Sequence, residues 1–374
     1  MNSLPFYTAG LFMNALNHDR GWSLADLSMG PTLLVLVMAL SAPVMGQAFD
    51  RYGERGFILL GLIVQAAAFG ALSQVDTLPA YWAAMGGMAL LGAGCSSPAY
   101  LRIINREFDA SKGAAFAITI TGAALFSTLV PPLLQAVIGA HGWRAGYSSL
   151  GIAVLISVLP IMLLIGRRPR VTERASQRGS SFSYLQLFRS PAFLPLALAI
   201  ATISVACPGL LIHFAPMLTR GGLTAQDAAW MVSLIGAAQI ASRLSTGLLV
   251  DHYFAPRVAA VIMIASSLGL GLLAWGGISW AVAGAIGVGL AYGAEADLVG
   301  YFAGRYYPKP HFGRVFGSFY AVFLGGTAAS PLLYGATVEY FGSYTPALVA
   351  AAAMLIVSAL FFLMLPRFPA NEEV

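Results

Sequence analysis

Arg243 stands inside an apolar stretch, 225–249, with Gln239 four residues before it. At helical spacing the two side chains lie on the same face. A guanidinium is costly in hydrocarbon, so its presence there marks a site, and its planar fork suits the two oxygens of a carboxylate. Two interpretations stay open. Arg243 and Gln239 bind an anionic substrate, or Arg243 pairs with an acid and locks the helices together.

Two acids, Glu295 and Asp297, stand in another apolar stretch, about two to three helical turns before Arg305. A carboxylate removed from water holds its proton more readily, and it can release that proton when water reaches it. The same acids could instead join Asp251, Arg257 and Arg305 in a charge network that closes one side of the protein. The sequence leaves proton coupling and gating as alternatives.

Single polar side chains in other apolar stretches are weaker candidates for contact with a substrate. Tyr7 and Tyr320 each offer a hydroxyl, and His213 is the one His inside an apolar stretch. A lone His in such a place is more often hydrogen bonded within the packing than part of a site. These three residues are therefore secondary candidates.

The composition predicts a membrane protein. Of 374 residues, 58% are hydrophobic and 9% are charged, against roughly 25% charged in soluble domains. Cys95 and Cys207 both lie in apolar stretches, so packing is expected of them rather than a disulfide. The net charge of +5 is spread over the polar connections, where it reports orientation in a membrane and not nucleic-acid binding.

Twelve apolar stretches that could form membrane helices follow one another along the chain. Helix is the expected state because an open sheet cannot satisfy its backbone in lipid. The stretches are 1–17, 25–46, 56–75, 80–101, 113–138, 145–166, 192–218, 225–249, 257–276, 279–303, 312–337 and 345–365.

The basic residues predict the orientation. If successive connections alternate between the two sides, all but four of the 20 Lys and Arg residues fall on the side of Asp50 and of both termini. Basic residues favour the cytoplasmic side. We therefore expect a multi-pass protein of the bacterial inner membrane, with both termini in the cytoplasm.

A polar, Arg- and Ser-rich segment divides the chain. Residues 167–190 join the sixth and seventh stretches and are expected to form a cytoplasmic linker. The segments on either side, 1–166 and 191–374, are then an N-terminal and a C-terminal six-helix bundle.

A charged motif occurs twice, 201 residues apart. Gly46 to Arg55 reads G-x-x-x-D-R-x-G-x-R, and Gly247 to Arg257 repeats its frame with changes. Its charges suit the end of a hairpin between membrane helices because they cannot enter hydrocarbon. The residues expected to govern gating are Gly46, Asp50, Arg51, Gly53, Arg55, Gly247, Asp251, Arg257 and Arg305.

The repeat extends beyond these loops. Ser23 and Thr224 stand at matching places before the second and eighth stretches, each as an expected helix cap. At such an interval the matches indicate two related halves.

On these residues the chain resembles the major facilitator superfamily, whose signature loop has this pattern and returns in degenerate form in the second half. The resemblance covers essentially the whole chain. It implies an all-α polytopic membrane protein with twelve transmembrane helices in two pseudo-symmetric six-helix bundles. It also implies secondary active transport by alternating access, with the substrate between the bundles near the midplane.

A narrower resemblance is to the monocarboxylate transporter and oxalate-formate antiporter branch. The run G-W-S at 21–23 is similar to that of the branch, and Arg243 stands where the branch has a carboxylate-binding Arg. The chain also departs from the pattern of this branch. Gln239 replaces an acid of the monocarboxylate carriers, residues 6–7 are aromatic where those carriers have Lys, and 312–337 lacks the Lys of the oxalate carriers. A substrate with one carboxylate is the expectation.

The first apolar stretch is short. Its clean part, Leu4 to Asn17, gives about 21 Å of helix against the ~30 Å of a hydrocarbon core. We expect a shortened first helix, with a start codon placed downstream of the natural one or a chain lacking its first turns.

The leading prediction is a transporter of a small organic anion, a monocarboxylate, working as a proton-linked symporter or antiporter and as a monomer in the lipid bilayer. Efflux of lipophilic or drug-like compounds and a non-transporting sensor with the same fold are the alternatives. The spans carry no metalloprotease or serine-hydrolase motif and the chain no P-loop, so we predict no enzyme, cofactor or metal site.

Overall fold

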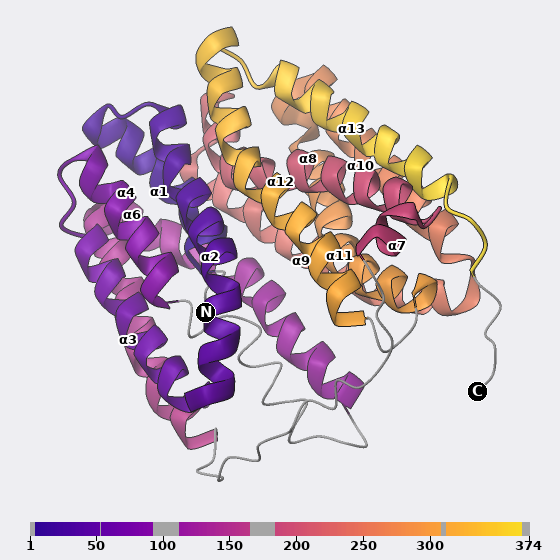
Figure 1. Ribbon diagram of the computed structural model, residues 1–374. Coiled ribbons are helices and arrows are strands. Elements are labelled where there is room, and N and C mark those ends of the chain that lie inside the picture. The colour runs from indigo at the N-terminus through magenta and orange to yellow at the C-terminus, as the bar shows by residue number, and fades with distance from the viewer. Residues whose placement is uncertain (1–3, 53, 93–111, 165–183, 308–311, 369–374) are drawn as a thin grey trace. The chain divides into compact units, whose positions relative to one another are not determined.

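The computed structural model describes residues 4–52, 54–92, 112–164, 184–307 and 312–368, and every regular element within these ranges is helical (Figure 1). The elements of the first half are α1 (Leu4–Arg20), α2 (Leu24–Tyr52), α3 (Glu54–Leu72), α4 (Leu78–Leu91) and α6 (Lys112–Leu164). The others are α7 (Tyr184–Arg189), α8 (Phe193–Arg220), α9 (Ala225–His252), α10 (Ala255–Gly276), the short 3-10 helix η2 (Gly277–Trp280), α11 (Ala281–Tyr306), α12 (Phe312–Phe341) and α13 (Thr345–Leu363).

Eight segments of the described chain are long and apolar enough to cross a membrane. Two of them hold two helices each, because Leu125–Leu163 contains a break at Gly142 and Ala255–Tyr306 takes in both α10 and α11. Each of the twelve predicted stretches overlaps a helical segment, which confirms the all-α, multi-pass prediction. The expected short first helix is α1, with 17 residues.

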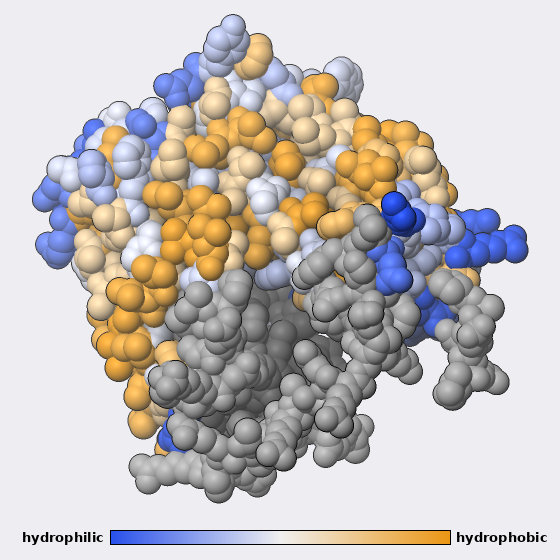
Figure 2. Space-filling view, viewed as in Figure 1, coloured by the Kyte–Doolittle hydropathy of each residue, from blue (hydrophilic) through white to orange (hydrophobic). Residues whose placement is uncertain are grey.

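Many large apolar side chains face outward, among them Leu159 at 68% and Leu248 at 67% exposure. Figure 2 shows hydrophobic side chains over much of the visible face. Exposed apolar area on this scale is unfavourable in water and favourable against lipid. The surface therefore fits a protein that is integral to a membrane.

Glycines with positive φ end helices at matching places in the two halves. Gly21 has φ 67° and Gly222 has φ 106°, while Gly142 has φ 80° and Gly342 has φ 68°. An L side chain is strained in this region of the backbone map, and glycine is not. The internal repeat is thus present in the backbone as well as in the charged loops.

The two predicted caps are confirmed. The Ser23 hydroxyl accepts from the Asp26 amide at 3.0 Å, and the Thr224 hydroxyl accepts from the Asp227 amide at 3.1 Å. Each hydroxyl also donates to the carboxylate of that Asp. The same reciprocal cap therefore begins α2 and α9.

Contacts divide the chain into two compact units. Unit 1 comprises Met1–Arg174 and Ile212–Ser233, and unit 2 comprises Ala175–Leu211 and Leu234–Val374. The two units thus share α8 and α9: the C-terminal part of α8 and the N-terminal part of α9 belong to unit 1, and the rest of both helices belongs to unit 2. The helix α7 falls inside the stretch 167–190 that was predicted as a linker, with its Leu187 fully buried.

Unit 1 is held at one end by a cluster of charged and aromatic side chains. Trp143 donates from Nε1 to Asp19 at 2.8 Å, and Arg144 lies 4.3 Å above the Trp143 ring. Asp76 accepts from both Arg20 and Arg144. The cluster joins the end of α1, the connection before α4 and the break in α6.

Unit 2 is held within its spans by hydroxyls that donate to backbone carbonyls of neighbouring helices. Ser267 of α10 bonds Ala352 of α13 at 2.8 Å, and Ser358 of α13 bonds Ala199 of α8 at 3.1 Å. In agreement with this, α10 packs closely against α11 and α13. Such bonds require short side chains and close backbones.

Candidate functional site

The helices α9 and α11 approach each other at two glycines of α11. A Cβ on Gly289 would lie 2.5 Å from the Cβ of Ala238, and one on Gly293 would lie 2.5 Å from the carbonyl oxygen of Gln239. Residue numbers rise together on both helices, so the two run parallel. This register puts residue 295 level with about residue 241, close to the depth of Arg243.

A polar stripe runs along the buried side of α9. Gln239, Ser242 and Thr246 are 3%, 1% and 2% exposed, and the Ser242 hydroxyl donates to the carbonyl of Leu290 on α11 at 2.7 Å. Arg243 is half-buried, one turn beyond Gln239 and about 12 Å along the helix from Asp251. The structure thus places the two leading candidates in one membrane span of unit 2.

Glu295 of α11 is 2% exposed. Neither of its carboxylate oxygens has a hydrogen-bond partner among the described residues. The thiol of Cys207, on α8, is near enough to interact electrostatically with this carboxylate. Asp297 lies in α11 too, but its side chain is outside the described part of the structure.

The contact between α8 and α12 is a feature that the sequence analysis missed. The Ser330 hydroxyl accepts from the Gly209 amide at 2.7 Å and donates to the carbonyl of Val205. These two groups would bond each other in a regular helix, so the hydroxyl is inserted into the hydrogen-bond ladder of α8, next to Pro208. The spacing Gly326, Ser330 on α12 is the signal that could have found it.

His213 is fully buried in the part of α8 that packs in unit 1. Its Nε2 lies 2.9 Å from the Ser28 hydroxyl of α2, and that hydroxyl donates to the carbonyl of Leu24. The Ser28 hydroxyl has one hydrogen, which it gives to the Leu24 carbonyl. The His213 ring must therefore donate from Nε2 to the Ser28 oxygen. Close by on the same helix, Thr219 donates to the Asn14 side chain at 3.1 Å. His213 therefore joins α8 to α2, which fits a packing role.

The two tyrosine candidates lie apart in the chain's units. Tyr7 is buried within α1 of unit 1. Tyr320, in α12 of unit 2, is 37% exposed and stacks between Phe316 and Phe323. A contact of either tyrosine with a substrate stays a prediction.

The gating candidates are only partly within the described structure. Gly53 lies outside it, as do the side chains of Asp50 and Arg51 and the surroundings of Gly46. Arg55 donates to the carbonyl of Met162 at 3.1 Å, so it ties α3 to α6.

In the second half, Gly247 and three charged candidates lie toward the ends of their helices. Asp251, Arg257 and Arg305 are exposed, and none of them forms an ion pair with any residue in the described ranges. Arg305 lies 4.9 Å from the Phe368 ring instead. Among the described side chains these three residues form no charge network, and a network that includes Asp297 stays a prediction.

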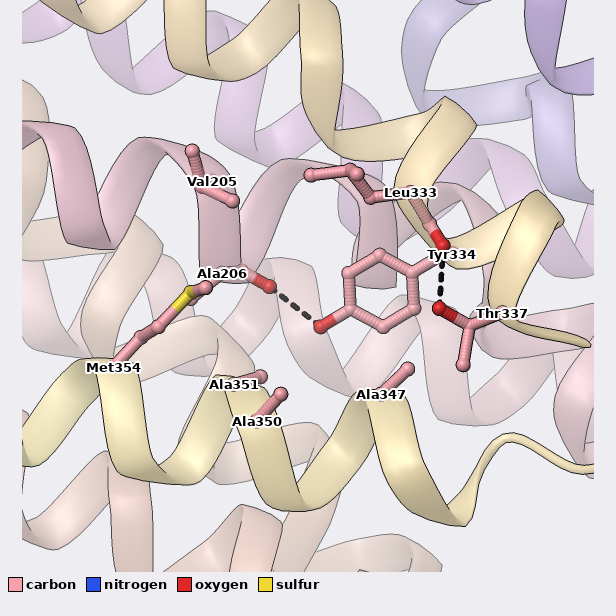
Figure 3. Close-up of a pocket in the computed structure, with 9 residues that line it drawn as sticks. All are labelled: Val205, Ala206, Leu333, Tyr334, Thr337, Ala347, Ala350, Ala351 and Met354. Atoms are coloured by element: carbon pink, nitrogen blue, oxygen red, sulfur yellow. Dashed lines mark hydrogen bonds between the residues drawn. The ribbon is translucent and has the colours of Figure 1, made fainter. Parts of the chain in front are cut away.

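A small crevice lies in unit 2 where α8, α12 and α13 meet (Figure 3). Its volume is about 70 Å³, and its walls are mostly Ala, Val, Leu and Met. The Tyr334 hydroxyl donates to the carbonyl of Ala206, and the Thr337 hydroxyl to that of Leu333. Pockets for drug-sized ligands are typically about 300–1,000 Å³, so this crevice is small by comparison, and its mostly apolar walls offer no charged group for a carboxylate.

Within the described residues, no group of three or more His, Cys, Asp or Glu side chains is arranged to hold a metal ion. Among the side chains described within the spans of unit 2, the charged candidates are the guanidinium of Arg243 and the buried acid Glu295, beside a row of hydroxyl and amide groups on α9.

Comparison with known proteins decides the family. The model of the Major Facilitator Superfamily matches residues 1–295 and again 214–374. The chain belongs to this superfamily. The fold agrees, because the crystal structure of a D-xylose-proton symporter superposes with a TM-score of 0.74 at 13% identity, over 96% of this chain and 94% of that one.

Two relatives show the range of this superfamily. Monocarboxylate transporter 11 of Mus musculus is 25% identical over 307 residues, covering 78% of this chain and 67% of its own. The Fujikurins efflux protein of Gibberella fujikuroi is 24% identical over 310 residues, covering 81% and 65%. The chain thus spans about two thirds of the length of these relatives. Its family and fold are those of membrane transporters.

Proposed function

We propose that this protein is a secondary active transporter that moves a small organic anion, a monocarboxylate, across the membrane by alternating access. The observation that carries the proposal is Arg243, a half-buried guanidinium within the membrane span α9. The similarity to monocarboxylate transporter 11 supports the same class of substrate. The protein would work as a monomer in the bacterial inner membrane, with both termini in the cytoplasm and the Asp50 and Asp251 loops as gates.

The chemistry of Arg243 fits one carboxylate. Its guanidinium stays charged at any physiological pH, and its fork can hold both oxygens of a carboxylate at once. The polar groups next to it on α9, Gln239 and Ser242, are neutral. A substrate with a single negative charge would leave no second charge without a counterion in the span.

Substitution of Arg243 tests the proposal in proteoliposomes. Losing one charge-assisted contact in a site shielded from water costs ~1.5–3 kcal/mol, or about ten- to 150-fold in binding. We expect Arg243→Lys to weaken exchange of a monocarboxylate by that factor and Arg243→Ala to abolish it. A matched control is Arg189→Lys, an exposed arginine on α7, which should leave the half-saturation concentration unchanged. If both Arg243 variants exchange the anion like the wild type, the proposal is wrong.

Efflux of lipophilic compounds is the second candidate, favoured by the similarity to the Fujikurins efflux protein. In that case the substrate would contact apolar and aromatic side chains, and Arg243 would serve packing. The two candidates separate in one measurement. A lipophilic cation or neutral dye that is exported at equal rates by the wild type and by Arg243→Ala would favour efflux.

A further inference from the structure

Residues 364–368, which follow α13, are fastened to the rest of unit 2. Leu365 is 5% exposed. The Tyr306 hydroxyl, at the end of α11, donates to the carbonyl of Pro366 at 2.7 Å. A short segment beyond the end of a helix is usually poorly ordered unless other contacts hold it. This segment is held by a second helix.

Phe368 makes most of the contacts of this segment. Its ring packs against Phe254, in the turn between α9 and α10, with 5.4 Å between the ring centroids. It also packs against two tyrosines of α11, Tyr306 at 4.9 Å and Tyr301 at 6.3 Å. Aromatic rings attract one another at these separations. One side chain thus joins the start of α10 to the end of α11.

A cation completes the aromatic cluster. The guanidinium carbon of Arg305 lies 4.9 Å from the centre of the Phe368 ring and 6.0 Å from that of Tyr301. A guanidinium over a ring face is attracted by the ring quadrupole. Arg305 forms no ion pair with any residue that the structure describes. Phe368 therefore holds the cation that the sequence analysis assigned to a charge network with Asp251 and Arg257.

The same cluster contacts the loop that repeats the charged motif. Phe254 lies three residues after Asp251, and the Tyr301 hydroxyl donates to the carbonyl of Val250, the residue before that acid, at 3.4 Å. The loop is thus held on both sides of its acid. Asp251 has no ion-pair partner within the described ranges, so a pairing requires a movement that disturbs these contacts.

We propose that residues 364–368 are a latch on the gate of the second half. The proposal rests on the proposed function, in which the Asp251 loop is a gate. While Phe368 is docked, it holds Arg305 and the loop in the arrangement described above. When it leaves, Arg305 is released to pair with Asp251 in the other state of the transport cycle. The docked segment lowers the population of that state and slows transport.

A distance measurement tests the docking without any substrate. Spin labels are attached at Tyr253→Cys and Arg367→Cys, two exposed positions that each adjoin one of the rings in contact, in a protein that carries Cys95→Ala and Cys207→Ala. By pulsed EPR we expect one narrow distribution of distances between the labels. In Phe368→Ala the distribution should become broader and longer, because the segment is no longer anchored.

Phe341→Ala is the matched control for this measurement. It is the same change at the end of α12, where the ring packs on the neighbouring Tyr340. The narrow distribution should remain in this variant. If Phe368→Ala also keeps the distribution of the wild type, the docking is overturned.

The latch itself is tested by exchange of labelled for unlabelled lactate, pyruvate or acetate in proteoliposomes. Loss of one cation–π contact at an exposed site changes an equilibrium about two- to fivefold. We expect Phe368→Ala to raise the maximal exchange rate by that factor and to leave the half-saturation concentration unchanged. Phe368→Tyr keeps the ring and should keep the wild-type rate. Phe368→Leu, apolar but without a ring, should also raise the rate, and it serves if Phe368→Ala does not reach the membrane.

The rise in rate should depend on Arg305. In Arg305→Ala there is no cation to release, so the addition of Phe368→Ala should bring no further rise. A rise by the same factor in this background would overturn the latch, because Phe368 would then act through other contacts.

The proposed function and the latch can fail separately. A wild type that exchanges none of these anions contradicts the proposed function, whereas the label distances still decide whether the segment docks. Normal exchange in the wild type with an unchanged or lower rate in Phe368→Ala contradicts the latch alone. A change in half-saturation as large as the change in rate also contradicts it, because the ring would then be acting on the substrate site.

Discussion

The two halves of the chain share a backbone but not a chemistry. Positive-φ glycines and reciprocal caps recur at offsets of 200 and 201 residues. At the same offset of 201, Arg243 corresponds to Ala42 and Glu295 to Gly94. Arg243 and Glu295 thus have no charged counterpart at the matching positions of the first half. The repeat therefore concerns the backbone, whereas the charged residues Arg243 and Glu295 occur in one half.

The two units also differ in where polar side chains hold their helices together. Unit 1 is held at one end by Asp19, Arg20, Asp76, Trp143 and Arg144, which are polar groups at helix ends. Unit 2 is held within its spans by glycines and by hydroxyls bonded to carbonyls, which unit 1 also has at Gly10 and Ser233. Close backbones leave little tolerance for added atoms, and they also fix the position of Arg243 and Glu295. We expect substitutions at such close contacts to be costlier than changes in the exposed charged cluster of unit 1.

The largest effect is expected at the contact between α9 and α11. Gly293→Leu would place atoms where a Cβ alone already lies 2.5 Å from the carbonyl of Gln239. Backbone cannot yield there, so the variant should lose about 3 kcal/mol or more of stability, measured by unfolding in detergent. Gly271→Leu on α10, where a Cβ meets nothing within 4 Å, is the control and should be close to neutral. Equal losses would show that the contact is not specially tight.

A smaller effect is expected where Ser330 enters the ladder of α8. Ser330→Ala leaves the Gly209 amide without its acceptor, and an unsatisfied buried donor costs about 1–3 kcal/mol. Ser149→Ala in α6 is the matched change, because that hydroxyl bonds only the carbonyl of Gly146 in its own helix. If Ser330→Ala is as mild as Ser149→Ala, α8 closes its own ladder when the hydroxyl is removed.

Much of the fold was accessible from the sequence, because apolar stretches, charged loops and cap residues are local signals. The caps at Ser23 and Thr224 were predicted correctly for that reason. The insertion of Ser330 into α8 was not, since it depends on how two helices distant in sequence meet. For the candidate site, the sequence identified Arg243 and Glu295 from the cost of charge in lipid. It could not tell that Glu295 lies apart from the exposed Asp251, Arg257 and Arg305, because burial is set by packing.

The charged cluster of unit 1 should matter less than either contact in unit 2. Asp76→Asn removes the carboxylate shared by Arg20 and Arg144, but Asp76 is 66% exposed. Exposed ion pairs contribute about 0–1 kcal/mol and are screened by salt. We expect a loss of at most about 1 kcal/mol at low salt that shrinks at high salt. A larger loss of unfolding free energy that salt leaves unchanged would show that the charged cluster stabilises unit 1 as much as the helix contacts stabilise unit 2.

The smallest difference is expected between the two caps, where the halves are most alike. Ser23→Ala and Thr224→Ala each remove the acceptor of one amide, at Asp26 and Asp227 respectively. Loss of a cap costs about 1 kcal/mol, and both caps have the same geometry, so the two losses in unfolding free energy should agree within about 0.5 kcal/mol. Equal losses would support the view that the repeat is a repeat of scaffold. If Thr224→Ala were clearly the costlier of the two, the cap would stabilise more than the first turn of α9. The part of the molecule that depends on it would then be the span α9 itself, which carries Arg243.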